Sequence, residues 1–184
     1  MKKNLLVASL LSVAATGAMA QAQANKETGF YAELGLAQAY YKESNANFNN
    51  AMGEIKAGYN INKYIAAEVM AAGNLNSANF NSGSTSINAK VSSAYGGYAK
   101  FSLPVNDDFS LFVRAGVTSA TVSATATNGG RYASAWSTGS DFSYGAGAQF
   151  NFTKDVYGQV DYMSYYNKNN ITVQAPSISV GYKF

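Results

Sequence analysis

The chemistry open to this chain rests on ten charged residues that alternate with small or apolar neighbours along extended segments. They are Glu33, Glu54, Lys56, Glu68, Lys90, Lys100, Arg114, Asp141, Asp161 and Lys183. Five are acids and five are bases, so acid–base catalysis and ion pairing are the chemistries to weigh. The 184 residues include no His and no Cys. This composition excludes a serine triad, a His or thiolate metal site and a Cys nucleophile.

We interpret the ten charges as structural ion pairs, and we predict no enzyme activity, no cofactor and no metal. When apolar residues are placed on one face of each segment, every one of these charges falls on the opposite face, among Gly, Ala and Ser. Small residues suit the crowded interior of a narrow barrel. An unpaired charge is very costly there, so acids and bases should pair. Arg114 can hold a carboxylate with two hydrogen bonds, and its candidate partners are Glu54, Glu68 and Asp161.

Eight β-strands with a two-residue period are predicted to position these side chains. The expected strands cover 30–41, 51–59, 64–73, 89–103, 109–123, 141–152, 156–166 and a final segment ending at Phe184. Long polar loops are expected after the first, third and fifth strands, the last two at 74–88 and 124–140. Tight turns follow the second, fourth and sixth. Outer-membrane barrels show this alternation of long extracellular loops with short periplasmic turns.

The final segment carries the clearest pattern for a strand that faces lipid. Ile178, Val180, Tyr182 and Phe184 share one face, and small or polar residues occupy the other. An exposed apolar edge would pair with another chain, whereas a closed barrel has no free edge. We therefore predict an all-β fold, an eight-stranded antiparallel up-and-down transmembrane β-barrel. A soluble barrel with an apolar interior is the alternative, but its outer face would need Lys and Glu in place of Gly, Ala and Ser.

The N-terminus has the features of a secretory signal peptide. Lys2 and Lys3 precede an apolar run, and Ala18-Met19-Ala20 supplies a small-x-small cleavage site. The run is shorter than the roughly 20 residues that span a bilayer as a helix. The expected divisions are 1–20 (signal peptide, with cleavage after residue 24 as the alternative), 21–28 (N-terminal segment) and 29–184 (barrel).

Composition and charge narrow the range of partners. Charged residues make up 12% of the chain, about half the roughly 25% of soluble domains, and aromatic residues make up 14%. Without Lys2 and Lys3 the chain has 11 basic and 10 acidic residues, a net charge of +1, which gives no basic field for nucleic acid. The expected partners are the lipid bilayer of the outer membrane and, through the Asn-rich loops, an extracellular ligand or host surface. Solvated loops without a ligand are the alternative.

Several short motifs resemble the family of small outer-membrane β-barrels that includes opacity-type proteins and the barrel domain of outer membrane protein A. The resemblance covers about 28–184. It is carried by Gly29-Phe30-Tyr31-Ala32, Gly58-Tyr59-Asn60-Ile61-Asn62, Ala66-Ala67-Glu68, Ala99-Lys100-Phe101-Ser102-Leu103-Pro104, Gly145-Ala146-Gly147 and Val180-Gly181-Tyr182-Lys183-Phe184.

This resemblance implies a place in the outer membrane of a Gram-negative bacterium. It also implies that the barrel-assembly machinery recognises Ile178, Val180, Tyr182 and Phe184. The function that fits best is non-enzymatic: a structural or adhesin-like protein that acts through its extracellular loops. A small porin for ions or small solutes is the alternative, and a membrane-embedded enzyme comes third because His and Cys are absent.

Overall fold

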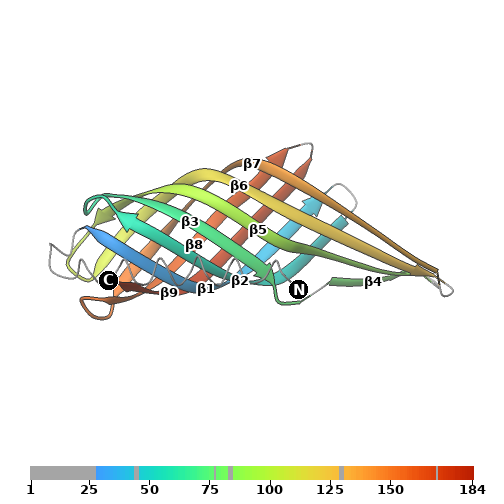
Figure 1. Ribbon diagram of the computed structural model, residues 1–184, viewed down its shortest axis with the longest axis horizontal. Coiled ribbons are helices and arrows are strands. Elements are labelled where there is room, and N and C mark those ends of the chain that lie inside the picture. The colour runs from blue at the N-terminus through green and yellow to red at the C-terminus, as the bar shows by residue number, and fades with distance from the viewer. Residues whose placement is uncertain (1–27, 44–45, 77, 83–84, 129–130, 169) are drawn as a thin grey trace, which may run out of the picture.

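The computed structural model describes residues 28–43, 46–76, 78–82, 85–128, 131–168 and 170–184, which form β-strands with short connections (Figure 1). The strands are β1 Gly29–Glu43, β2 Ala46–Asn60, β3 Ile65–Asn74, β4 Ala78–Ser82, β5 Thr85–Pro104, β6 Phe109–Asn128, β7 Arg131–Asn151, β8 Val156–Lys168 and β9 Ile171–Lys183. No helix in these ranges is long and apolar enough to cross a lipid bilayer. The predicted signal peptide, and the N-terminal segment apart from Thr28, lie outside the described residues.

Eight of the nine strands in the described ranges close into an antiparallel barrel. Strand β9 pairs with β1, with Val180 opposite Leu34, and this joins the last strand to the first. Strand β3 pairs with β5, with Phe101 opposite Ile65, and this completes the ring. Strand β4 pairs with β5 outside the ring. The predicted eight-stranded barrel is therefore confirmed, with one additional strand.

The tight turns gather at one end of the barrel, which we call the turn end; the C-terminus lies there too (Figure 1). In the β2–β3 turn, Asn62 Oδ1 accepts hydrogen bonds from the backbone N–H groups of Tyr64 and Ile65 at 2.8 and 2.9 Å. Asn106 Oδ1 does the same for Phe109 at 2.8 Å in the β5–β6 turn. Asn side chains favour turns because they can bond to their own backbone in this way.

At the opposite end the structure corrects the predicted loops. Most of 74–88 and 124–140 is strand, because β5, β6 and β7 continue well beyond the ring, and Trp136 lies on β7 rather than in a loop (Figure 1). We call this extension the flange, and it consists of β4 with residues 85–92, 119–128 and 131–140. Its Asn, Ser and Gly content predicts loops, yet the antiparallel ladder satisfies the backbone without interruption from Thr118 opposite Asp141 to Asn128 opposite Arg131.

A β-bulge corrects the predicted face of one segment. The β5–β6 register shifts between Val91 and Ser93, so one extra residue of β5 has no direct partner. Val91 is consequently buried, although the uninterrupted two-residue period placed it in lipid. Lys90 lies opposite Ser123 and moves with the shift to the outer face. The prediction that Lys90 lies in the barrel interior is therefore wrong.

Elsewhere the alternation of environments follows the predicted faces. Leu34, Val113, Val160, Ile178 and Val180 point outward and are about half or more exposed, whereas their strand neighbours are buried. Exposed aromatic side chains border this apolar belt. At the turn end they are Phe30, Tyr59, Phe101, Phe150 and Phe184, and at the flange end they are Tyr40, Tyr95, Phe142, Tyr144 and Tyr162. Two such girdles are typical of a barrel that crosses a bilayer.

Candidate functional site

Seven of the ten predicted charges are buried together inside the barrel. We call this set the charged layer: Glu33, Glu54, Lys56, Glu68, Lys100, Arg114 and Asp161. Six different strands contribute to it, so residues far apart in sequence meet across the lumen. Each position follows from strand alternation, since each side chain has apolar, outward-facing neighbours on both sides.

Arg114 lies at the centre of the charged layer and is 1% exposed. Its Nε and Nη2 donate to the two oxygens of Glu68, the Nη2 bond at 3.1 Å, and its Nη1 donates to Asp161 Oδ2 at 2.8 Å. This fork binds the Glu68 carboxylate with two hydrogen bonds, the strongest ion-pair geometry available to a side chain. Of the three partners considered from the sequence, Glu68 and Asp161 contact Arg114, whereas Glu54 binds Lys56.

The two lysines join the remaining carboxylates to this centre. Lys56 Nζ donates to Glu54 Oε1 and lies 3.8 Å from both Glu33 Oε2 and Asp161 Oδ2. Lys100 Nζ lies 3.7 Å from Glu33 Oε1 and 3.8 Å from Glu68 Oε1. Each cation is therefore within reach of two or more carboxylates, and the contacts form one connected network rather than isolated pairs.

Neutral donors complete the coordination of the carboxylates. Tyr31 Oη donates to Glu68 Oε1 at 2.5 Å and Tyr157 Oη donates to Glu33 Oε1 at 2.9 Å. Gln159 Nε2 donates to both Glu33 and Asp161 at 3.2 Å, and Ser177 Oγ donates to Asp161 Oδ1 at 2.7 Å. Four acids face three bases here, so these donors stabilise the excess negative charge.

Glycines on neighbouring strands make room for the large side chains beside the charged layer. Gly58 lies directly opposite Tyr31, and a Cβ at Gly58 would meet the Tyr31 ring at 2.3 Å. Gly181 lies opposite Tyr157 in the same way, with a Cβ contact of 2.2 Å. Each tyrosine therefore lies flat over a strand and directs its hydroxyl at a carboxylate. These glycines are needed for close approach, as expected in an eight-stranded interior.

The other three predicted residues lie outside the charged layer. Lys90 faces outward beyond the bulge. Asp141 lies on β7, and its side chain pairs with Lys168 of β8 at 2.6 Å. Lys183 lies near the turn end, where its Nζ donates to Asn151 Oδ1 at 3.0 Å.

The two-residue period puts Gln159 on the same face as Asp161, and Ser177 on the face opposite Ile178, but it does not identify either residue as a partner of the charges. The signal available was their shared face with Asp161: Gln159 is two residues away on the same strand, and Ser177 lies opposite Asp161. The sequence does not identify Lys168 as a partner either, because it lies in the connection between the predicted strand 156–166 and the final segment.

Cavities lie on both sides of the charged layer. One of about 570 Å³ opens at the turn end, and Lys100, Ser110, Gln149, Tyr157 and Lys183 are among its lining residues. The other, of about 350 Å³, lies at the flange end. The layer between them joins opposite walls through buried contacts, so its geometry is that of a plug across the lumen. Within the described ranges there is no group of three or more acidic side chains positioned to hold a metal ion.

Comparisons with known proteins agree with this architecture. The model of the family described as outer membrane protein beta-barrel domain matches residues 8–184. A search of curated protein sequences finds no match.

Two solved structures of small barrels resemble the chain over most of its length. Ail, the attachment invasion locus protein of Yersinia pestis, has 20% identity and a TM-score of 0.65, and the match covers 86% of this chain and 99% of Ail. Neisserial surface protein A has 20% identity and a TM-score of 0.60, with 84% of this chain and 97% of that protein covered. At these identities the likeness shows the fold.

Proposed function

Because the chain belongs to the outer membrane protein β-barrel family and is therefore a protein of the Gram-negative outer membrane, we propose that it is a non-enzymatic surface-interaction protein with a plugged lumen. The flange carries this proposal. In outer-membrane barrels the short turns face the periplasm, so the flange projects from the cell surface. It is an ordered sheet that begins where the flange-end aromatic girdle ends, and it presents Trp136, which is 77% exposed.

The charged layer supports this reading over the porin alternative. A porin needs a continuous water-filled lumen, and porins with 16 or more strands provide one. Here eight strands leave an interior that side chains fill, and the contacts of Arg114 reach from β6 to β3 and β8 across it. Ail was crystallised with sucrose octasulfate, a heparin analogue, so a barrel of this architecture can carry an extracellular ligand. A sulfated polysaccharide is therefore the first probe for this chain.

We expect shortening of the flange to abolish adherence without preventing barrel assembly. Val122 lies opposite Ser137, so residues 123–136 can be replaced by an Asn-Gly turn without a change of register below them. Bacteria that express the wild type or the shortened variant would be compared for adherence to a heparin-coated surface. Different migration of unboiled and boiled protein on a detergent gel would verify that both barrels are folded. Equal adherence of the two strains would contradict the proposal.

We further propose that Phe184 acts during assembly. Phe184 is 49% exposed, its ring lies 5.1 Å from the Tyr182 ring, and its backbone N–H donates to Phe30 O at 2.9 Å. A side chain that is about half exposed and packs mainly against one ring contributes little to the finished barrel. The side chains that the barrel-assembly machinery would recognise share the outward face of the final segment: Ile178, Val180, Tyr182 and Phe184.

Deletion of Phe184 should therefore lower the amount of protein in the outer membrane several-fold. The urea midpoint of protein refolded in lipid vesicles should change little. Phe152→Ala is the matched control, because Phe152 is an exposed aromatic residue at the same end of the barrel. Normal outer-membrane levels after deletion, or an equal loss in the control, would argue against a role in recognition.

A further inference from the structure

The barrel wall has an incomplete seam between β7 and β8. Backbone pairing of these strands ends at Tyr144 opposite Ser164, although β7 continues to Arg131 and β8 to Lys168. A register shift in β8 between Ser164 and Tyr166 accompanies this end point. No backbone pair joins the two strands past Tyr144 in the described ranges, so β7 has a free edge there.

Side chains close the first part of this seam. Ser143 Oγ donates to Tyr165 O at 3.1 Å, Asn167 N–H donates to Asp141 Oδ2 at 3.2 Å, and Lys168 Nζ lies 2.6 Å from Asp141 Oδ1. Asp141 lies just outside the flange-end girdle, next to Phe142. The hydrogen bond from Lys168 and that from the Asn167 backbone hold the pKa of the Asp141 carboxyl below its usual range. Beyond Asp141, no backbone pair, side-chain hydrogen bond or ion pair joins β7 to β8 in the part of the chain that the structure describes.

An apolar cavity lies directly beyond these bridging contacts. It has a volume of about 350 Å³ and reaches from the inner face of β6 and β7 to β8, β9 and β1. Tyr41, Trp136 and Tyr166 contribute aromatic surface, and Val122, Ile171 and Val173 contribute aliphatic surface. None of the described residues that line it is charged. The volume falls within the range of small-molecule sites, which are mostly apolar with a few polar groups.

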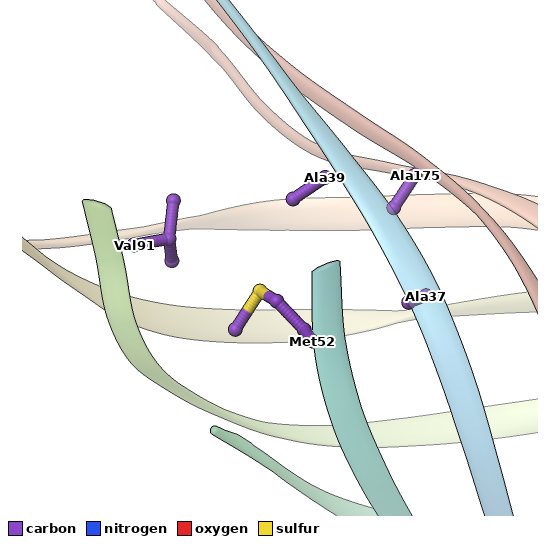
Figure 2. Close-up of a cluster of buried hydrophobic side chains, with 5 residues drawn as sticks. All are labelled: Ala37, Ala39, Met52, Val91 and Ala175. Atoms are coloured by element: carbon purple, nitrogen blue, oxygen red, sulfur yellow. The ribbon is translucent and has the colours of Figure 1, made fainter. Parts of the chain in front are cut away.

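The apolar character continues below the cavity into the barrel. Figure 2 shows Ala37, Ala39, Met52, Val91 and Ala175, which form a buried apolar cluster. Val122 and Ala120 belong to the lining of the cavity and also pack against this cluster. The lumen is therefore apolar at the flange end and charged at its centre. A cavity with so few polar partners holds water poorly and favours hydrocarbon.

We propose that this cavity binds the alkyl chain of an amphiphile, whose polar head lies at the mouth or at the open seam. The seam opens just beyond Asp141, on the extracellular side of Phe142 and Tyr144 of the flange-end girdle, so the mouth of the cavity lies close to the outer edge of the lipid-facing surface. The alkyl chain can come from two sources. A lipid of the outer leaflet can enter through the seam, and a free fatty acid can enter from the medium.

Trp136 is the only Trp in the sequence and lines the cavity, so its fluorescence reports on the site. The protein would be refolded into nanodiscs of unlabelled phospholipid and titrated with dibrominated stearate, whose bromine atoms quench Trp at short range. We expect quenching that saturates. In a second arm, nanodiscs made from phospholipid with brominated chains test the lipid source without added fatty acid.

Gly139→Leu fills the cavity, because a Cβ at Gly139 points toward Tyr166 with an ordinary contact of 3.5 Å. It should weaken binding of dibrominated stearate by at least about tenfold. Ser140→Leu adds similar bulk to the exposed neighbouring residue, and it should leave binding unchanged. Val173→Asp is the second variant, because a carboxylate in the lining should also weaken binding without adding bulk.

The two arms distinguish the sources. Quenching by brominated lipid that Gly139→Leu reduces and Ser140→Leu retains identifies a lipid chain as the occupant. Saturable quenching by added stearate alone, with the same pattern across the variants, identifies a free amphiphile. Quenching by added stearate that does not saturate, together with quenching by brominated lipid that is equal in Gly139→Leu, Val173→Asp and Ser140→Leu, overturns the proposal.

Discussion

Arg114→Ala should destabilise the folded barrel by about 3–5 kcal/mol, the usual cost of removing one partner from a buried ion pair. The substitution removes the contacts to Glu68 and Asp161 together, and both carboxylates are buried. The charged layer then holds four acids against two bases. Urea unfolding in lipid vesicles, followed by the difference in migration between folded and unfolded protein, measures the loss.

Two further variants separate charge from geometry. Arg114→Lys keeps the positive charge, but an ammonium cannot bind Glu68 with two hydrogen bonds and reach Asp161 as well, so we expect it to recover part of the loss. Adding Glu68→Gln to Arg114→Ala restores the wild-type excess of one negative charge. That double variant should be more stable than Arg114→Ala alone. If it is less stable, charge imbalance is not what destabilises the single variant.

The same substitution tests the plug. In planar bilayers the wild type should conduct poorly or only in rare openings, because the charged layer fills the lumen between the two cavities. Arg114→Ala should raise conductance, since unpaired carboxylates favour the entry of water and cations. A large and steady wild-type conductance that Arg114→Ala leaves unchanged would favour the porin reading.

Much of this site could be predicted from alternation alone. A strand with lipid on one side and a packed lumen on the other must alternate, so Arg114 and its neighbour Val113 were assigned to opposite faces, as the structure shows. The pairing of charges within the lumen depends on the stagger between strands, which the period does not encode. For this reason the sequence leaves three candidate partners for Arg114, and only the register between the strands selects among them.

The errors of prediction have local causes. The bulge between Val91 and Ser93 inserts one residue, and the sequence around it has no feature that marks the insertion. On the N-terminal side of the bulge, each residue of β5 faces the side opposite to the predicted one. Lys90 therefore lies on the outer face and not in the interior. Most of the flange is predicted as loop because Asn, Ser and Gly are poor strand signals in isolation. Strand propensity depends strongly on packing against the neighbouring strand. Here the continuous backbone pairing of β6 with β7 fixes the extended conformation.

Val113→Arg should cost roughly 2–4 kcal/mol, the range measured for a cation on the lipid face near the middle of a bilayer. Val113 is 52% exposed and lies opposite Phe101 on β5 and Ala146 on β7, both on the outer face. It is between the two aromatic girdles, where no water is available for a guanidinium. The free energy of unfolding in urea would be measured for wild type and variant in the same vesicles.

Ser110→Arg is the control for this prediction. Ser110 lies three residues away on the same strand but on the inner face, where it lines the cavity of about 570 Å³ at the turn end. A guanidinium there has room and polar neighbours such as Gln149, which lies directly opposite, so the cost should be below about 1 kcal/mol. Val113→Ala should cost little as well, which separates the effect of charge from the loss of the valine. If Val113→Arg proves harmless and Ser110→Arg prevents folding, the two faces of the barrel are reversed and the charged layer cannot be its interior.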